Sequence, residues 1–304
     1  MNETETKGSR AGFVAIIGRP SAGKSTLINT MCGEKVSIIS AVPQTTRNRV
    51  RGIVTRPGGQ LVLVDTPGFH VSDRTMNQHM RGLIDETVRE SDAILYVVDG
   101  SRPPGEEERE LVSLVAGRAS AMPVVVALNK IDTARKTTRS AAEALLDQSL
   151  AGCPRAAISA LTGEGVEELV SVLLGLLPED VPSYPEDYYT DQEPEFRVSE
   201  IIREKAINLM RQELPHSLYV EVADMEVRND EDTDRLWIRA FILVERNSQQ
   251  GMVVGKGGEK IKQIRQSAQK EIARLFPYRI HLDLRVKVAS RWQRDERVLR
   301  RLIR

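Results

Sequence analysis

A glycine-rich segment directly after the first apolar run constrains the fold of this chain more than any other feature. Residues 18–25 read GRPSAGKS, which matches the pattern G-x-x-x-x-G-K-[S/T]; they follow the apolar run 13–17 and open a helical pattern. In this context the glycines let backbone N–H groups surround a phosphate, and the helix N-terminus adds partial positive charge. The segment therefore predicts a phosphate-binding loop between the first strand and first helix of an α/β domain.

The side chains of this loop have expected roles. Lys24 is expected to reach the β- and γ-phosphates of a nucleotide, and the hydroxyl of Ser25 is expected to bind Mg²⁺. A chance match to the four fixed positions should occur about once in a hundred chains of this length, and a preceding strand makes it rarer. The candidate phosphate-site residues are Gly18, Arg19, Pro20, Ser21, Ala22, Gly23, Lys24, Ser25 and Thr26.

A second motif, DTPG at residues 65–68, ends the apolar run 61–64. The carboxylate of Asp65 can hold Mg²⁺ through water, and the N–H of Gly68 can meet a γ-phosphate oxygen. Such contacts would couple this loop to the state of the nucleotide. The candidate residues are Asp65, Thr66, Pro67 and Gly68.

A third motif, NKID at residues 129–132, ends the apolar run 124–128 and predicts the choice of base. Asp132 can accept hydrogen bonds from the N1–H and 2-amino groups of guanine. Adenine has neither donor, and a buried carboxylate left without them would lose about 1–3 kcal/mol. A backbone N–H after the run 156–159 can reach the guanine O6. The candidate base-site residues are Asn129, Lys130, Asp132, Ser159 and Ala160.

Between the phosphate loop and Asp65 lies the polar stretch 43–47, PQTTR. Its Thr46, preferred here over Thr45, is the candidate that joins Ser25 and Asp65 around Mg²⁺. Thr46 and Gly68 are candidate switch residues, ordered by GTP and released after hydrolysis. No catalytic residue is assigned, because Phe69 stands where Ras-like enzymes place the glutamine that orients water. Slow hydrolysis follows, at or below ~10⁻⁴ to 10⁻² s⁻¹.

Alternating apolar runs and helical patterns predict a three-layer α/β domain with a parallel sheet. The predicted strands are 13–17, 61–64, 94–99, 124–128 and 156–159, and the predicted helices are 76–90, 106–117, 140–150 and 164–177. Four prolines between 178 and 194 predict a semi-rigid linker. The expected division is a flexible N-terminus at 1–10, a nucleotide domain at 11–178, a linker at 179–195 and a second domain at 196–304.

The second domain reads as α+β, in the order helix, strand, strand, short helix, helix, strand. Its longer elements are expected at 198–213, 218–227, 235–245, 260–275 and 279–288. A Gly-x-x-Gly loop at 255–258 precedes the basic helix; alone it is a weak signal, but this element order is typical of an RNA-binding KH domain of the second topological type. The candidate RNA-binding residues are Gly255, Lys256, Gly257, Gly258, Lys260 and Lys262.

Charge is distributed unevenly along the 304 residues, although 43 Lys and Arg balance 43 Asp and Glu. Residues 246–304 contain 16 basic and 5 acidic residues, a net of +11, so residues 1–245 carry −11. A basic segment of this kind suits a phosphate-backbone binder, although a solvated surface is the alternative. Trp292 in the basic tail is expected to pack in a core or docking contact, with stacking on a base as the alternative.

The composition argues against membrane-spanning, secreted and disulfide-bonded or zinc-binding proteins. No stretch approaches the roughly 20 apolar residues of a membrane-spanning helix, and the polar N-terminus predicts a cytoplasmic protein. Cys32 and Cys153 are far apart without nearby metal-ligand spacing, so they are expected to be small core residues rather than a disulfide or a zinc site.

The motifs together resemble the Era family, bacterial GTPases with a Ras-like domain followed by a type II KH domain. The resemblance also rests on the segments 201–205 (IIREK), 213–215 (ELP), 243–246 (LVER) and 286–288 (VKV). It implies binding of GTP and GDP with Mg²⁺, slow hydrolysis, and contact of the KH domain with the 3′ end of 16S rRNA. It also implies a monomer acting in 16S rRNA processing and 30S subunit assembly, no binding to DNA, and peripheral contact with the inner face of the cell membrane.

One departure from the family bears on hydrolysis. Ser21 stands where the family usually has an asparagine that helps related GTPases bind an activating potassium ion, which puts potassium stimulation in question. Two alternatives stay open. The chain could be an RNA-binding scaffold that binds GTP but hardly hydrolyses it, or a membrane-associated signalling GTPase whose basic domain meets acidic proteins or lipid.

Overall fold

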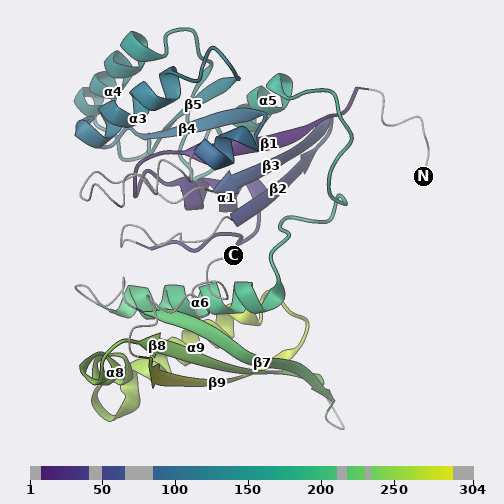
Figure 1. Ribbon diagram of the computed structural model, residues 1–304, viewed down its shortest axis with the longest axis vertical. Helices are drawn as coiled ribbons and strands as arrows, with labels where there is room; N and C mark the ends of the chain where they lie inside the picture. The colour runs from purple at the N-terminus through teal and green to yellow at the C-terminus, as the bar shows by residue number, and fades with distance from the viewer. Residues whose placement is uncertain (1–7, 41–49, 66–84, 211–217, 230–233, 290–304) are drawn as a thin grey trace. The chain divides into compact units, whose positions relative to one another are not determined.

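The computed structural model describes residues 8–40, 50–65, 85–210, 218–229 and 234–289 (Figure 1). The chain divides into two compact units at residues 191 and 192, and residues 38–40 are grouped with the second unit. This division falls inside the predicted linker 179–195, and the other predicted domain limits stay predictions. No helix within the described ranges is both long and apolar enough to cross a membrane.

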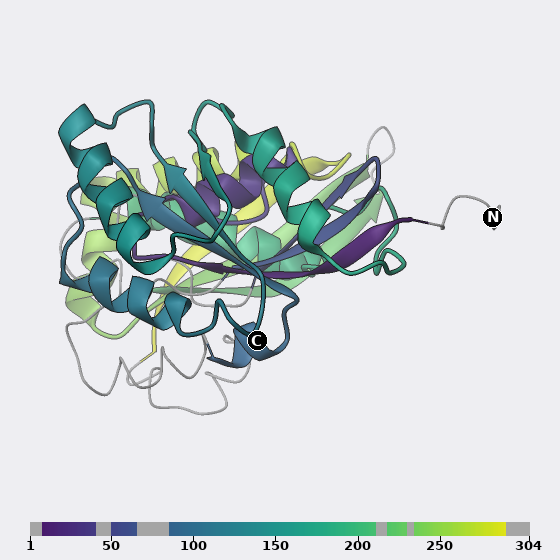
Figure 2. The ribbon, with the colours of Figure 1, turned by 90° about the horizontal axis from the view of Figure 1, so that it is seen from above.

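The first unit is built on a six-stranded sheet in the order β2-β3-β1-β4-β5-β6. The parallel strands are β1 (Arg10–Ile17), β3 (Gly59–Asp65), β4 (Ala93–Asp99), β5 (Val124–Asn129) and β6 (Arg155–Ala157). Helices cover both faces (Figures 1 and 2), and β3, β4 and β5 are buried along their whole lengths. The predicted three-layer α/β architecture is confirmed.

An additional strand, β2 (Val50–Arg56), lies outside the predicted set and corrects the expectation of a wholly parallel sheet. It pairs antiparallel with β3 through a tight connection at residues 57–58. The run is interrupted by Arg51 and Gly52, so it does not form the continuous apolar pattern of a central parallel strand. Its position at the edge of the sheet explains this composition, because one side of an edge strand needs no strand partner.

Four helices that lie wholly within the described residues pack on this sheet: α1 (Lys24–Cys32), α3 (Glu106–Ala116), α4 (Lys136–Ser149) and α5 (Val166–Leu176). Apolar residues of α3 and α4 share one core with β1, β4 and β5, whereas α1 and α5 contact each other and β3. Helix α4 begins four residues before the predicted start. The prediction missed its first turn because that turn is polar and shows no apolar periodicity. Of the predicted helix 76–90, only residues from 85 on are described, and 85–89 are helical.

Most of the predicted linker belongs to the first unit. The side-chain amide of Gln60 donates to the carbonyl of Tyr184 at 2.9 Å and accepts its N–H at 3.0 Å. The N–H of Ile53 donates to the carbonyl of Tyr189, also at 2.9 Å. Residues 184–190 are therefore attached to β2 and β3 by hydrogen bonds and are not a free spacer.

The second unit has the predicted order of elements. They are α6 (Pro194–Leu209), β7 (Tyr219–Asn229), β8 (Asp234–Val244), α8 (Asn247–Val254), a 3₁₀ turn η1 (Lys256–Gly258), α9 (Glu259–Ile272) and β9 (Arg279–Val288). Helix α6 begins at Pro194, a residue that was expected in the linker. Proline suits the first position of a helix because its φ is suitable and it has no N–H that needs a partner. The α+β expectation is confirmed.

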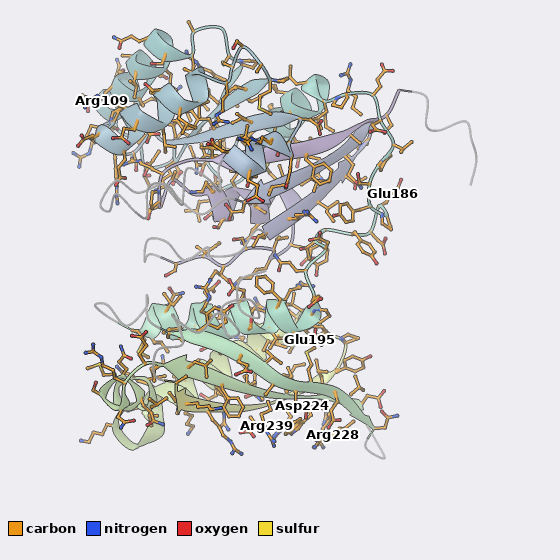
Figure 3. All side chains as sticks on the ribbon, in the orientation of Figure 1. Arg109, Glu186, Glu195, Asp224, Arg228 and Arg239 are labelled. Carbon is orange, nitrogen blue, oxygen red and sulfur yellow. The ribbon has the colours of Figure 1, made fainter. Side chains whose placement is uncertain are left out.

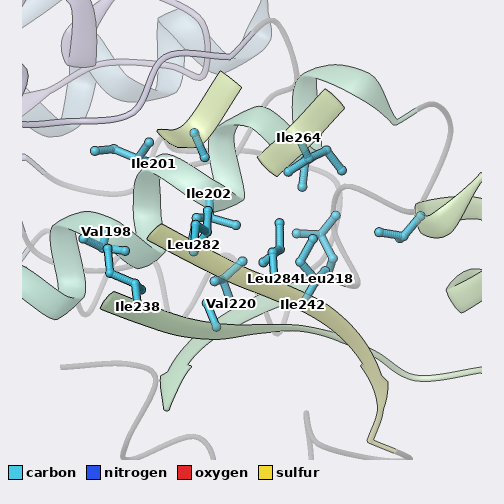
Figure 4. Close-up of a cluster of buried hydrophobic side chains, with 14 of the residues drawn as sticks. Val198, Ile201, Ile202, Leu218, Val220, Ile238, Ile242, Ile264, Leu282 and Leu284 are labelled. Carbon is cyan, nitrogen blue, oxygen red and sulfur yellow. The ribbon is translucent and has the colours of Figure 1, made fainter. Parts of the chain in front are cut away.

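The core of the second unit lies between two helices and one face of its sheet (Figure 4). Ile264, Ala268 and Ile272 recur every four residues on α9, and all three are fully buried. They meet Ile238 and Leu284, which point to the same face from β8 and β9. Strand β8 is central, antiparallel to β7 and parallel to β9. The opposite face of this sheet carries the alternate residues of each strand.

Cys32 and Cys153 are half-buried free thiols, and Cys153 packs against the core shared by α3, α4 and their strands. Burial raises the pKa of Cys32 to about 12, opposed by the nearby Arg56. This thiol stays protonated at neutral pH.

Candidate functional site

The loop between β1 and α1 is closely packed against neighbouring strand ends. Gly23 caps α1 with a φ of 97°, and a Cβ built there would lie 2.3 Å from Nδ2 of Asn129. A Cβ at Gly18 would lie 2.5 Å from the carbonyl oxygen of Val97. Any larger residue at either position would have to displace backbone or a buried amide, so both glycines are required by the fold itself.

Lys24 is buried beneath this loop, and its ammonium group is bonded to the loop's own carbonyls. Nζ donates to the carbonyl oxygens of Gly18 at 2.9 Å and Arg19 at 3.2 Å. Burial lowers the pKa of Lys24, while the carboxylates of Asp65 and Glu108 oppose the shift. A phosphate placed in the loop would therefore meet a positive charge that is already positioned and only partly compensated.

Ser25 and Asp65 lie together at the ends of neighbouring elements. The hydroxyl of Ser25 donates to Oδ2 of Asp65 at 3.4 Å, and the hydroxyl of Ser37 does so at the same distance. Asp65 is fully buried. Mg²⁺ binds oxygen ligands and usually takes only one or two carboxylates from the protein, together with water and phosphate oxygens. The Ser25 and Asp65 pair therefore fits the predicted metal site. Thr26 follows in the first turn of α1, and Thr46, Thr66, Pro67 and Gly68 lie outside the described residues.

Asn129 at the end of β5 connects three separate segments. Its Nδ2 donates to the carbonyl of Ala22 at 2.8 Å, and its Oδ1 accepts the N–H groups of Lys130 at 2.8 Å and Ala160 at 2.9 Å. The side chain is almost fully buried. It therefore fixes the phosphate loop relative to both candidate base-site segments. The N–H of Ala160, which belongs to the segment expected to reach the guanine O6, donates to Asn129 in this structure.

The other base-site residues are oriented by hydrogen bonds of their own. The hydroxyl of Ser159 donates to Oδ1 of Asp132 at 2.7 Å, which holds the carboxylate while its residue stays exposed. Nζ of Lys130 donates to the carbonyl of Ser21 at 2.7 Å and to Oδ2 of Asp99 at 2.9 Å. The structure thus brings together all the predicted loop and base-site residues that it describes.

A buried charged cluster beneath the loop was not expected from the sequence. Nε of Arg19 lies 2.9 Å from Oε2 of Glu108, and the hydroxyl of Tyr96 donates to Oε1 of the same carboxylate at 2.5 Å. This ion pair joins a mostly buried guanidinium to a fully buried carboxylate. Burial raises the pKa of Glu108, against the influence of Tyr96 and Arg19. Nothing in the sequence pointed to this cluster, because Glu108 looks like an ordinary acidic residue in the first turn of a helix.

The second candidate site is the loop between α8 and α9. Gly255, Gly257 and Gly258 have φ values of 73°, 60° and 80°, a region that glycine occupies without strain. Gly258 is also the N-terminal cap of α9, so the helix begins directly after the loop. Lys256, Lys260 and Lys262 are exposed around this helix start. The arrangement combines an accessible backbone, a helix N-terminus and three cations, all of which favour phosphate. Trp292 lies outside the described residues.

Two family models match the chain, one in each half. Residues 13–130 match the model described as 50S ribosome-binding GTPase, and residues 213–293 match the model of the KH domain. The first match covers the phosphate loop and the NK of the base motif. The second covers the glycine loop 255–258 and the three-stranded sheet.

Relatives match over nearly the whole length. The GTPase Era of Treponema denticola is 45% identical over 295 residues, covering 96% of this chain and 99% of that protein. The crystal structure of a single-residue variant of Aquifex aeolicus Era bound to GDP·AlF4⁻ has a TM-score of 0.87 at 32% identity, covering 96% of this chain and 98% of the other. A structure of Era in complex with MgGDPNP and nucleotides 1506–1542 of 16S ribosomal RNA has a TM-score of 0.88, also at 32% identity, with 97% and 98% covered.

Proposed function

The chain belongs to the Era family of GTPases, and from this premise we propose that its first unit is a GTP-dependent switch and that its second unit binds the 3′ end of 16S rRNA. The observation that carries the proposal is the pair of glycine-rich loops, each at a helix N-terminus, on two separate units of one chain.

The phosphates of GTP or GDP would occupy the loop 18–23. Lys24 would exchange its carbonyl partners for phosphate oxygens, and the backbone N–H groups of the loop would supply further donors. Ser25 and Asp65 would hold Mg²⁺, which neutralises negative charge on the phosphates. Solved relatives with GDP·AlF4⁻ and with MgGDPNP support this assignment.

The base would lie against Asp132, whose carboxylate is already oriented by Ser159. Guanine offers this carboxylate two further donors, whereas adenine offers none and would leave Ser159 as its partner without any donor from the base. Asn129 would act through the loop and through Ala160 rather than on the base alone, because its side chain bonds to both segments. Binding of the phosphates and of the base would therefore be coupled.

The RNA would contact the loop 255–258 and the exposed lysines of α9. Lys256, Lys260 and Lys262 would pair with phosphates, and the glycines would let the RNA backbone approach closely. The neighbour solved with nucleotides 1506–1542 of 16S rRNA supports this partner. We place the protein in the cytoplasm, in 16S rRNA processing and assembly of the small ribosomal subunit. Peripheral membrane contact and a monomeric state stay predictions of the family resemblance.

A second candidate function keeps RNA binding but removes the switch. Ser21 has a φ of 62°, a left-handed conformation in which asparagine is several-fold enriched over most residues. Serine in place of the family's asparagine removes an amide ligand, and Phe69 cannot orient water. These two residues favour a scaffold that binds GTP and hydrolyses it very slowly.

Fluorescence anisotropy of a labelled single-stranded RNA from the 3′ end of 16S rRNA distinguishes these functions. The full chain is titrated with a non-hydrolysable GTP analogue or with GDP, beside the variant Lys256→Asp, Gly257→Asp. Tighter binding with the GTP analogue, lost in the variant, is the result expected for a switch. Equal affinity in both states would leave the scaffold, and absence of binding in both would overturn the RNA assignment.

A further inference from the structure

The face of the second sheet that is turned away from α6 and α9 carries its own pattern. Pairing places Trp237 opposite His281, Arg239 opposite Asp283, and Phe241 opposite Arg285. These residues alternate with Ile238, Ala240 and Ile242, which are buried in the core, so they project to the other side. Figure 3 shows Arg228 and Arg239 on the side of the sheet away from α6.

Trp237 lies between two arginines on this face. The guanidinium carbon of Arg228 is 4.1 Å from the centre of the Trp237 ring, and that of Arg239 is 4.6 Å from it. Arg228 pairs with Arg235, two residues before Trp237, whereas Arg239 follows two residues after it. The two guanidinium groups therefore approach the ring from opposite directions along the strand. We call these three residues the Arg-Trp-Arg stack.

The stack is accessible to a ligand. The side chain of Arg228 is 54% exposed and that of Arg239 is 41% exposed, although each has an acidic neighbour. Arg228 is paired with Glu226, and Nε of Arg239 donates to Asp283 at 3.1 Å. Arg228 contacts Glu226 through Nε and one terminal nitrogen, and Arg239 contacts Asp283 through Nε. The fork geometry of arginine therefore leaves further donors on each guanidinium for another group.

Charge on this face rises from one edge of the sheet to the other. The outward residues of β8 and β9 include five cations and one anion, an excess of four positive charges. They are Arg235, Arg239, Arg279, Arg285 and Lys287, against Asp283. On β7 the outward residues Glu221, Asp224 and Glu226 outnumber Arg228. A polyanion would therefore follow β8 and the edge strand β9 rather than β7.

We propose that this face is a second binding surface for single-stranded RNA, with bases against the Arg-Trp-Arg stack and phosphates against the cations of β8 and β9. The proposal rests on the proposed RNA-binding function and extends it. Guanidinium planes held against an aromatic ring offer flat surfaces on which bases stack, whatever their sequence. Strand β9 is an edge strand, and the helices α8 and α9 that flank the loop 255–258 both contact it. RNA held by the loop 255–258 would therefore continue around that edge.

Two RNA lengths and one intrinsic fluorophore test the proposal in the full chain. A ~5-nucleotide RNA from the 3′ end of 16S rRNA fills the glycine loop, which clamps about four nucleotides, and a ~16-nucleotide RNA reaches further. The double variant Arg228→Lys, Arg239→Lys keeps the charges and removes the guanidinium planes. Arg274→Lys, at an exposed position of the same unit, is the matched control.

The double variant should weaken binding of the longer RNA about tenfold, the scale of one lost base stack, and leave the shorter RNA unchanged. The chain has two tryptophans, so Trp292→Phe leaves Trp237 as the sole tryptophan fluorophore, and the longer RNA alone should quench it. Unchanged affinity of the longer RNA, with no quenching, would overturn this surface. If the shorter RNA does not bind the unaltered protein at all, the proposed RNA-binding function itself would be contradicted.

Discussion

The two glycine-rich loops of this chain look alike in sequence and differ in their surroundings. In the loop 18–23, a Cβ at Gly23 would collide with Asn129, and one at Gly18 would collide with the backbone of β4. In the loop 255–258, a Cβ at Gly257 or Gly258 would meet no heavy atom of the described residues within 4 Å, apart from its chain neighbours. The first loop is packed, whereas the second is open at Gly257 and Gly258, although a Cβ at Gly255 would lie 2.8 Å from Cγ of Lys260.

Glycine is therefore needed for a different reason in each loop. The glycines of the first loop leave room for the protein's own atoms, so they contribute to folding before any ligand binds. Gly257 and Gly258 meet a backbone requirement, a positive φ, and leave space beside them that no described neighbour occupies. Gly255 also has a positive φ, but it packs against Lys260. Substitutions in the first loop should therefore change both stability and binding, whereas those in the second should act mainly on binding.

Gly23→Ala is expected to have the largest effect. A left-handed alanine costs about 1–2 kcal/mol, and displacing Asn129 leaves buried groups unpaired for about 1–3 kcal/mol more. The free energy of unfolding of the nucleotide-free protein should fall by about 2–5 kcal/mol, and guanine-nucleotide binding should be lost. Urea unfolding and titration with a fluorescent GDP measure both. A variant as stable as the parent would show that the loop is not packed.

Asn129→Ala removes the side chain that connects the loop to the base site. Three hydrogen bonds are lost, and the buried carbonyl and N–H groups they satisfied lose their partner. We expect a loss of about 2–3 kcal/mol in unfolding free energy, together with weaker binding of both GDP and GTP. Thermal and urea denaturation measure the loss of stability, and calorimetric titration measures the affinity for GDP and GTP. Weakened GDP binding at full stability would contradict a structural role for this side chain.

A pH series tests the buried lysine of the first loop against the exposed lysine of the second. Because the pKa of Lys24 is lowered in the folded protein, the unfolded chain binds this proton more tightly. Between the lowered and the ordinary value, the unfolding free energy of the nucleotide-free protein should rise by up to about 1.4 kcal/mol per pH unit. Nucleotide affinity should fall over the same range, since phosphate favours the charged form.

The variant Lys24→Met should lose this rise in stability, as measured by urea unfolding at each pH. Lys256→Met, which changes an exposed lysine, is the matched control and should keep it. If the stability slopes of the two variants are the same, the slope belongs to other groups.

Gly258→Ala should have the smallest effect on stability. Its φ of 80° makes alanine unfavourable by about 1 kcal/mol, but no described neighbour has to move. Thermal unfolding measures the change, and GDP binding should be unaltered. A loss as large as that of Gly23→Ala would remove the distinction between the two loops.

Features that depend on short stretches of chain could be predicted. The loop 18–23, Asp65 and Asn129 each follow an apolar run, and parallel strands bring their carboxyl ends to one edge of the sheet. The position of these side chains therefore follows from their order in the sequence. The glycine loop 255–258 could also be placed from local pattern, because a short apolar helix precedes it and a basic helix follows it.

Features that depend on pairing across the chain could not be predicted. Strand β2 has a weak pattern and is recognisable mainly by its antiparallel partner β3. Glu108 resembles other acids of its helix turn until α3 packs beside Arg19 and Tyr96. The Arg-Trp-Arg stack requires the register of β7 on β8, which no local pattern fixes.

The parallel pairing of β8 with β9 has a consequence for the synthesis of the protein. Residues 245–278, the 34 positions from one strand to the next, must be made before β9 can begin to pair. At about 5–20 residues per second, translation takes roughly 2–7 s over this stretch. During that time the nascent chain exposes one unpaired edge of an apolar strand, which is when other chains can add to it. Strand β9 thus pairs late, and truncation before residue 279 would leave a chain prone to aggregate.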